Sequence, residues 1–263
     1  MSGAADYVVL GWPAAVGAAA AGAVLANGTF SPGSSFWGPV LSRAPFGDGR
    51  GVALTFDDGP TPGTTDRALD VLGEMGVKAA FFVVGRNARQ HPGLVERMHA
   101  EGHVVGNHTL DHSHFGLFGR TPYWKRQVAE ADEAIRRIIG RRPALFRPPM
   151  GIKTGHVTEA ASALGHTVVT WTRRAFDGVG TTPRRIVRRL ASNTTAGDIL
   201  LLHDGVEPHA LRRDASATVA ALPPLITRLR DRGLEPRPLD RMLALDAYQA
   251  DGATVTATAS RGG

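Results

Sequence analysis

Two adjacent aspartates, Asp57 and Asp58, stand where an apolar run ends in a glycine and a proline. Neighbouring side chains on a strand point to opposite faces, so both acids can serve one site only where the strand ends and bends. Gly59 and Pro60 supply such a bend. The carboxyl ends of parallel strands are where active sites gather, although a solvent-exposed turn uses the same residue types. Taken alone, the segment favours these two interpretations equally.

His108 and His112 follow a second apolar run and are four residues apart. This spacing predicts one helical turn with both imidazoles on the same side, where they suit a single metal ion. Together with Asp58 they would form a three-ligand site with open positions, which is typical of a catalytic metal. A lone histidine pair is more often incidental. His114 fits no second ligand pattern, so we interpret it as a surface residue or as one that contacts the metal ligands.

Further polar residues follow three more apolar runs. Arg147 precedes two prolines that hold the backbone extended, and it is suited to pairing with a catalytic carboxylate, although a plain loop with an exposed arginine is the simpler interpretation. Trp171 and Asp177 follow the next run. His203 ends the run at Leu200–Leu202 and is a candidate general acid, or equally a structural histidine bonded to an acid. The five segments together are more specific than any one.

An alternation of strands and helices between Arg50 and about Leu245 would position these side chains. The expected strands are Val52–Phe56, Ala79–Val84, Val104–Gly106, Ala144–Phe146, Thr167–Trp171, Ile199–Leu202 and, more weakly, Glu235–Pro238. The expected helices are Thr64–Met75, Gly93–Ala100, Pro122–Ile139, Gly155–Leu164, Pro183–Ser192 and Ala215–Arg232. This rhythm predicts an α/β fold, with a parallel sheet or barrel covered by helices.

The N-terminal residues 1–27 form a separate hydrophobic segment, in which residues 7–26 carry no charge. That length just spans a hydrocarbon core, so membrane association through residues 7–26 is the first interpretation, with a signal peptide or a packed alanine-rich helix as alternatives. The protein would then be membrane-anchored or belong to the cell envelope, on either side of the membrane. Residues 28–49 are expected to be a linker or edge wrap, residues 50–247 the main domain, and residues 248–263 a disordered tail.

Composition restricts the chemistry. The 263 residues are 43% hydrophobic, which allows a large core, and they include no cysteine, so any metal must be held by histidine or carboxylate. The formal net charge is +6, from 30 basic and 24 acidic residues. A positive charge attracts anionic molecules in general and does not identify a particular partner. The sequence has no zinc finger, RNA-binding signature or phosphate-binding loop, so no nucleic acid partner is expected.

The motifs TFDDGP, HTLDH, RPPMG, the stretch from Trp171 to Asp177 and LLLHD, in this order, resemble the polysaccharide deacetylases of carbohydrate esterase family four. That family shares the domain of nodulation-type chitooligosaccharide deacetylases. The resemblance implies a distorted (β/α) barrel of about seven parallel strands, here preceded by the N-terminal hydrophobic helix. It also implies a hydrolase of non-peptide carbon–nitrogen bonds that removes N-acetyl groups from a chitin-like or peptidoglycan-like glycan.

The resemblance assigns a metal and the residues around it. The expected metal is a divalent ion. Zinc is the first choice, and Co²⁺, Ni²⁺ or Mn²⁺ are the alternatives. Asp58, His108 and His112 match its ligands, and Asp57 matches the catalytic base. Arg147 matches the residue that holds this base in place.

The remaining roles concern the proton donor and the acetyl pocket. Asp177 matches an acid that pairs with the arginine, and His203 matches the general acid. The resemblance further implies that Leu201 would line the acetyl pocket, that the backbone N–H of Met150 would be the oxyanion donor, and that Trp171 would contribute to substrate binding.

The sequence departs from the family pattern at three positions. Met150 stands where tyrosine is usual, Gly178 where tryptophan is common, and Arg174 where an acid is common. These positions shape the groove, so the departures leave the glycan open more than the reaction. A deformylase or deacylase of a lipid-linked amino sugar on the same scaffold, or an inactive carbohydrate-binding protein, remain the alternatives.

Overall fold

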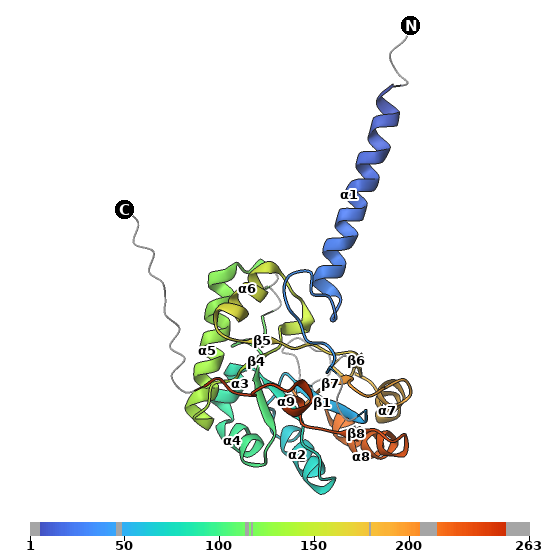
Figure 1. Ribbon diagram of the computed structural model, residues 1–263. Helices are drawn as coiled ribbons and strands as arrows, with labels where there is room; N and C mark the ends of the chain where they lie inside the picture. Colours follow the sequence, from blue (N-terminus) through green and yellow to red (C-terminus); the bar gives the residue numbers. More distant parts are fainter. Residues whose placement is uncertain are drawn as a thin grey trace, which may run out of the picture.

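The computed structural model of the chain describes residues 6–250, except residues 46–48, 114–115, 117, 179 and 206–214, with side chains from residue 16 onward (Figure 1). Short parallel strands form one curved sheet in the order β5–β4–β3–β2–β1–β7–β6, with β8 beside β1. The strands are β1 (Gly51–Asp57), β2 (Ala80–Val83), β3 (Val104–Asn107), β4 (Leu145–Phe146), β5 (Thr167–Val168), β6 (Arg173–Arg174), β7 (Ile199–His203) and β8 (Glu235–Pro236). The prediction of a distorted barrel with about seven parallel strands is confirmed.

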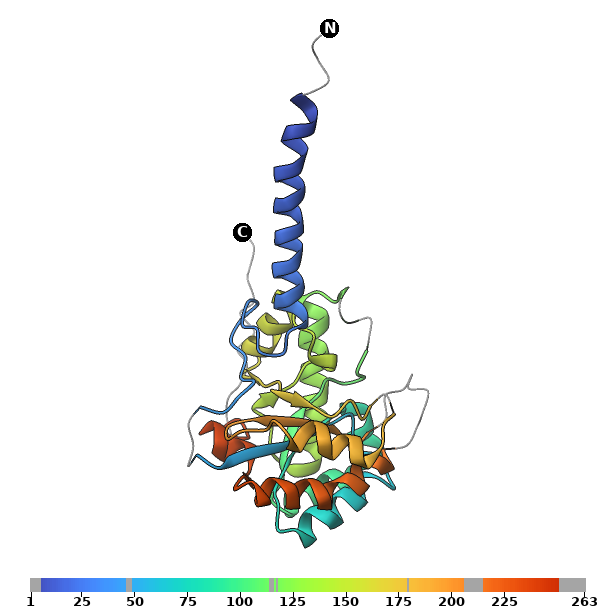
Figure 2. The ribbon, with the colours of Figure 1, turned by 90° about the vertical axis from the view of Figure 1, so that its right-hand side faces the viewer.

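Most of the helices cover the outside of this sheet and connect its strands, whereas α1 projects away from it (Figures 1 and 2). The helices are α1 (Asp6–Phe30), α2 (Thr65–Glu74), α3 (Gly85–Gln90), α4 (Pro92–Ala100), α5 (Thr121–Ile139), the short 3₁₀ helix η2 (Pro149–Gly151), α6 (Gly155–Ala163), α7 (Pro183–Ala191), α8 (Ser216–Asp231) and α9 (Leu239–Leu243). Proline in the first turn begins α4, α5 and α7, where its missing N–H costs no hydrogen bond. Gly140 ends α5 in the left-handed conformation.

The sheet packs an apolar layer on each side. Every residue of β1 is buried, as expected for a strand covered on both faces. Alternate residues of β1 and β2, such as Phe56 and Phe81, pack outward against α2, α4 and α8. Their neighbours, such as Ala53 and Phe82, fill the interior of the barrel together with Trp171 and Leu201. The strand register places Asp57 opposite both Phe82 in β2 and His203 in β7, so the carboxyl ends meet.

The stretch expected as a linker, residues 28–49, packs along the open side of the barrel in its described part. Leu41 bridges to Val169 beyond β5, and the Leu41 N–H donates to the Val168 carbonyl at 2.9 Å. The Ala44 N–H donates to the Gly197 carbonyl beside β7 at 2.8 Å. The described part of this segment therefore contacts the barrel both beyond β5 and beside β7.

The expected disordered tail begins with residues that the domain holds. The Tyr248 hydroxyl accepts the Val105 N–H at 3.2 Å, and the Gln249 amide donates to the Pro143 and Leu164 carbonyls. The ordered domain thus extends beyond the expected boundary at 247, because these side chains satisfy backbone groups near β3, α6 and the loop before β4. Residues 251–263 lie outside the described residues.

Helix α1 projects away from the domain and continues to Phe30, beyond the expected end at 27 (Figures 1 and 2). Among the described residues, no helix combines the length and apolarity that crossing a membrane requires. The prediction of a membrane anchor over residues 7–26 is therefore not supported.

Replacing Phe81 with alanine tests the outer apolar layer. Phe81 is fully buried and its ring stacks on Phe56 with centroids 4.9 Å apart, so Phe81→Ala should lower the free energy of unfolding by about 3–5 kcal/mol. Urea denaturation followed by circular dichroism measures the change. Phe118 is 82% exposed, and Phe118→Ala should stay within about 0.5 kcal/mol of the wild type. Equal losses in the two variants would contradict this description of the core.

Candidate active site

A pocket of roughly 210 Å³ opens at the carboxyl ends of the strands, where the sequence analysis expected a site. Its lining comes from six different strand ends and the loops that follow them. The lining residues are Asp57, Asp58, His108, His112, Met150, Trp171, Arg174, Phe176, Gly178, Leu201 and His203. All ten predicted site residues except Arg147 and Asp177 line this pocket, and those two lie directly behind it.

Asp58, His108 and His112 form a buried cluster whose ligand-type atoms all lie within 4.8 Å of one another. The His108 Nε2 and His112 Nε2 atoms lie 3.4 and 3.2 Å from Asp58 Oδ1. Two imidazoles and one carboxylate suit zinc and similar divalent ions, and three ligands leave coordination positions open for chemistry. The predicted ligand set is thus brought together in one place.

The prediction of a helical turn between the two histidines is wrong. Residues 108–112 form an irregular loop after β3, in which Thr109 and His112 have φ of 67° and 51°. The backbone leaves the strand and reverses at Thr109, so His112 returns to His108 through a turn. The imidazole rings of His108 and His112 are nevertheless close, with centroids 4.9 Å apart, because this loop brings them together as a helical turn would have done.

The tautomer of His108 provides a test of whether the cluster fits a metal. Its Nδ1 atom lies 2.7 Å from the Arg147 carbonyl oxygen, which can only accept a hydrogen bond. Nδ1 therefore carries a proton, and Nε2, which faces Asp58, is the ring nitrogen left for a metal. A carbonyl behind the ring is the usual way in which proteins orient a metal-ligating histidine, so the donor set fits a divalent metal.

Arg147 is fully buried behind the pocket, and each of its donor groups has a partner. The guanidinium donates from Nη1 to Asp57 Oδ1 at 2.7 Å and to Thr55 Oγ1 at 2.8 Å. It also donates to the carbonyls of Val169 and Thr170 at 3.2 and 2.9 Å. One oxygen of Asp57 is thus fixed, while Oδ2 faces the metal cluster, 3.8 Å from His108 Nε2.

His203 rather than Arg147 is the partner of Asp177, which corrects the pairing expected from the resemblance. Asp177 Oδ1 lies 2.8 Å from His203 Nδ1, and Oδ2 accepts the His203 backbone N–H and the Thr218 hydroxyl, both at 2.8 Å. Asp177 therefore orients the imidazole that ends β7. The correction has a simple cause: the carbonyls of Val169 and Thr170 already occupy the far side of the Arg147 guanidinium.

The charges of the pocket shift the pKa of several predicted site residues, including His203 and Asp58. Burial disfavours the imidazolium of His203, but the Asp177 carboxylate outweighs that cost and raises the pKa of His203 to about 10. Burial likewise favours the neutral form of Asp58, yet the hydrogen bond from His108 and the nearby charge of His112 lower the pKa of Asp58 well below its usual range. At neutral pH the pocket thus holds an ionised carboxylate beside a protonated imidazole.

A second set of residues holds the loop that carries the two histidines, and the sequence analysis did not identify it. The Gln127 amide oxygen on α5 accepts the N–H groups of Leu110 and Asp111 at 3.2 and 3.3 Å. Asn107 donates to Asp132 at 2.7 Å and accepts the Thr109 N–H at 2.8 Å. These residues lie inside an amphipathic helix and at a strand end, where sequence alone gives no signal that a polar side chain is buried.

Backbone strain is concentrated around this pocket. Among the described residues other than glycine, Asp58, Thr109, His112, Met150, Phe176 and Ala244 have φ in the left-handed region, between 51° and 72°. All except Ala244 belong to the pocket or to its histidine loop. Such conformations cost of order 1 kcal/mol or more each and persist where the surrounding structure requires them, which is typical of functional sites.

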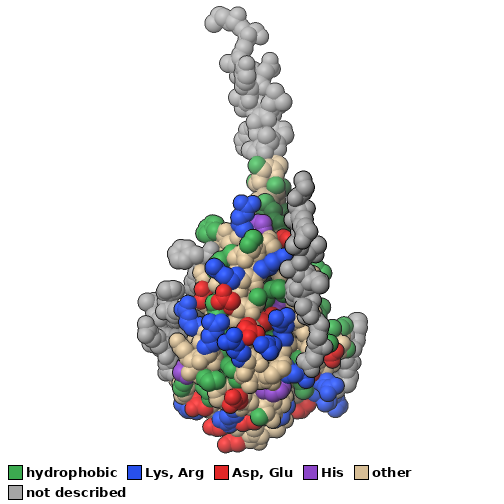
Figure 3. All heavy atoms as spheres, turned by 90° about the vertical axis from the view of Figure 1, so that its left-hand side faces the viewer, with side chains coloured by type: hydrophobic (Ala, Val, Ile, Leu, Met, Phe, Trp, Pro, Cys, Tyr) green, Lys and Arg blue, Asp and Glu red, His purple; other side chains and the backbone are tan. Residues whose placement is uncertain are grey.

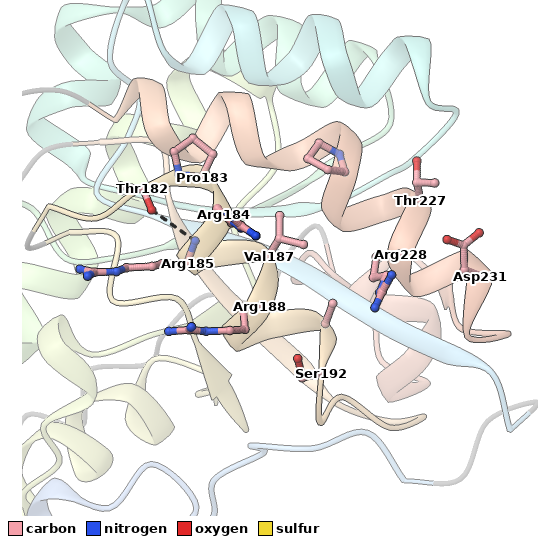
Figure 4. A pocket seen from close by; sticks show the side chains of 12 residues that line it. Thr182, Pro183, Arg184, Arg185, Val187, Arg188, Ser192, Thr227, Arg228 and Asp231 are labelled. Carbon is pink, nitrogen blue, oxygen red and sulfur yellow. Dashed lines mark hydrogen bonds between the residues drawn. The ribbon is translucent and has the colours of Figure 1, made fainter.

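A larger hollow, of about 1060 Å³, lies between α7 and α8 (Figure 4). Arg184, Arg188, Arg228 and Asp231 are among the residues that line it. It contains no histidine and no buried carboxylate, so its lining offers neither metal ligands nor a base. The smaller pocket at the strand ends is therefore the candidate active site.

Comparisons with known proteins agree with the geometry. A sequence profile described as Polysaccharide deacetylase matches residues 46–169. A chitooligosaccharide deacetylase of Sinorhizobium fredii is 42% identical over 187 residues, which are 69% of this chain and 86% of the relative. A peptidoglycan-N-acetylglucosamine deacetylase of Bacillus cereus is 33% identical, over 69% of this chain and 64% of the relative.

Solved structures give the same result. A peptidoglycan N-acetylglucosamine deacetylase superimposes with a TM-score of 0.73 at 29% identity, over 80% of this chain and 95% of the other. A family 4 carbohydrate esterase from Streptomyces lividans, in complex with acetate, has a TM-score of 0.66 at 28% identity, over 77% of this chain and 97% of the other. The similarity thus extends over nearly the whole of both solved structures.

Replacing a histidine of the cluster should abolish tight metal binding. His108→Ala removes one of three ligands, and since loss of an outer-shell partner alone typically costs 10–100-fold in metal affinity, we expect a loss of at least about 100-fold. Zinc stoichiometry after dialysis, with competition by a chromophoric chelator, measures the affinity. His156 is an exposed histidine on α6, and His156→Ala should keep the wild-type affinity. Stoichiometric, undiminished zinc in His108→Ala would overturn the assignment of the ligands.

Proposed function

The chain belongs to the polysaccharide deacetylase family, and we propose that it removes N-acetyl groups from an amino-sugar polymer or oligosaccharide of the chitin or peptidoglycan kind. It is a hydrolase of non-peptide carbon–nitrogen bonds in a metal-dependent family. The observation that supports the proposal most is one small pocket that joins Asp58, His108 and His112 to an Asp57 fixed by Arg147 and a His203 held by Asp177.

The cluster of Asp58, His108 and His112 would hold the metal, which we propose to be zinc, with Co²⁺, Ni²⁺ or Mn²⁺ as substitutes. When bound, a divalent ion polarises a carbonyl and lowers the pKa of water. The protein supplies the other groups. A pocket of about 210 Å³ is smaller than the ~300–1,000 Å³ of common ligand sites, so it would admit an acetamide group while the glycan lies across the rim.

Asp57 would act as the general base. Arg147 holds its Oδ1, so Oδ2 remains free on the side of the metal cluster to accept a proton from the attacking water. His203 would act as the general acid and give its proton to the leaving amine, and its Nδ1 is held by Asp177. The backbone N–H of Met150 would donate to the oxyanion, since its left-handed conformation turns this part of the loop after β4 toward the pocket.

Leu201 and Trp171 would form the apolar wall around the acetyl methyl group. Both line the pocket and are 4% and 5% exposed, so little of either side chain faces solvent. A glycan of the chitin or peptidoglycan kind belongs to a cell surface or wall, so we propose the cell envelope as the place of action. Related peptidoglycan-N-acetylglucosamine deacetylases carry such a substrate in their names.

Acetate release tests the proposal. The zinc-loaded protein should release acetate from chitooligosaccharides or peptidoglycan fragments, and Asp57→Asn should lower kcat by about 10²–10⁴-fold while keeping its zinc. Asp70→Asn on the exposed surface of α2 is the matched control. Formate or a fatty acid released in place of acetate would contradict the proposal in favour of another deacylase, and glycan binding without any turnover would favour a binding protein.

The pH dependence tests the role of His203. The Asp177 carboxylate raises the pKa of His203, so Asp177→Asn should lower that pKa by about 1–3 units. Because the imidazole must be protonated to act as an acid, the alkaline limb of the profile of kcat/KM should move to lower pH by that amount. Asp231→Asn, exposed on α8, should leave the profile in place. An unchanged alkaline limb in Asp177→Asn would rule out His203 as the acid.

A further inference from the structure

An exposed aromatic ring and an arginine stack on one rim of the pocket, outside the metal cluster. Phe176 is 43% exposed, and its left-handed backbone, with φ of 57°, presents the ring at the pocket rather than in the core. The Arg174 guanidinium lies over this ring, 4.1 Å from its centroid. Arg189 of α7 lies on the same ring at 5.1 Å and is held by a hydrogen bond to the Ala175 carbonyl at 2.8 Å.

Alternation along β6 sends its two arginines in different directions. Arg173 pairs with Leu200 in register and its guanidinium lies 3.6 Å from Asp198, away from the pocket. Arg174 pairs with Leu201 and lines the pocket with it. Within the described ranges, no carboxylate lies at ion-pair distance from Arg174. The adjacent acid, Asp177, is engaged by the backbone and ring of His203 and by Thr218, so it does not neutralise the arginine.

The same side of the molecule carries further positive charge. Helix α7 contains four arginines and no acid, and Arg185 and Arg188 project from one side of it (Figure 4). Arg185 and Arg188 are among the residues that line the hollow between α7 and α8, whereas Arg189 lies on the Phe176 ring. Figure 3 shows the opposite face of the molecule, on which basic and acidic side chains are interspersed. On α5, for example, Glu133 pairs with Arg136 and Arg137.

We propose that Arg174, stacked on Phe176, is a subsite for a carboxylate of the glycan, so that the enzyme prefers acidic N-acetylated glycans over neutral ones. The proposal rests on the proposed deacetylase function and names its substrate class. Stacking limits the motion of the guanidinium before binding and leaves its N–H edge free to donate two parallel hydrogen bonds to a carboxylate. The arginines of α7 add a positive field that attracts a chain of such groups.

A matched pair of substrates isolates the charge. One is a tetrasaccharide of the peptidoglycan backbone, in which alternate sugars carry a free lactyl carboxylate. The other is the same tetrasaccharide with each carboxylate converted to a neutral amide. For the wild type, kcat/KM should be about 10-fold higher on the acidic form, mainly through KM, and this preference should shrink at high salt.

Variants then assign the preference to Arg174. Arg174→Gln should bring the ratio of kcat/KM for acidic over neutral tetrasaccharide close to one, and Arg174→Asp should invert it. Phe176→Ala should lower the ratio in part, because the guanidinium loses its stacking surface, while Phe176→Tyr should restore it. Arg137→Gln makes the same charge change on a side chain that is 75% exposed and far along α5, and it should keep the wild-type ratio.

Two results would overturn the proposal: a wild-type ratio near one, or a ratio that Arg174→Gln leaves unchanged. A general failure of catalysis is distinguishable from both. If the wild type releases no acetate from either tetrasaccharide, the deacetylase proposal fails, and calorimetric binding of the two tetrasaccharides then decides on the subsite. Tighter binding of the acidic form that is lost in Arg174→Gln would still support it, and equal binding of both forms would refute it.

Discussion

The buried ion pair between Arg147 and Asp57 is the contact on which the site depends. Its side chains are 0% and 4% exposed, so neither charge is solvated, and an unpaired charge in this position would be strongly destabilising. The Arg147 side chain fixes Asp57 at the end of β1 and bonds to carbonyls beyond β5. Its own carbonyl orients His108. Arg147 thus positions both the Asp57 carboxylate and His108, one of the three candidate metal ligands.

The fold supplies what this arrangement needs. Parallel register brings the ends of β1, β3, β4 and β7 to one side, and Phe82 inside the barrel packs on the Arg147 guanidinium with 4.0 Å between the guanidinium carbon and the ring centroid. Strained backbone turns then place Asp58 and His112 inside the pocket and leave Met150 and Phe176 exposed at its rim. The interior of the pocket is thus rigid and buried, while its rim offers exposed groups suited to recognising a larger molecule.

Local patterns in the sequence predicted the strand ends and the chemistry of the pocket, because apolar runs and the polar residues after them are neighbours in the chain. Partners across the fold were less accessible. The pairing of Asp177 with His203 instead of Arg147 depends on how β6 and β7 align, and the support of the histidine loop by Gln127 depends on a helix packed against it. The loop between His108 and His112 requires a positive φ at Thr109, and a threonine in the sequence does not indicate such a conformation. Helix α1 was predicted in place, although it continues to Phe30.

Anomalous diffraction at the zinc edge, on crystals of the zinc-loaded protein, tests the central claim most directly. The account predicts one strong peak about 2.0–2.2 Å from Asp58, His108 Nε2 and His112 Nε2, with Asp57 still bonded to Arg147 and outside the coordination sphere. A peak elsewhere in the molecule, or an Asp57 carboxylate that leaves Arg147 to ligate the metal, would contradict it.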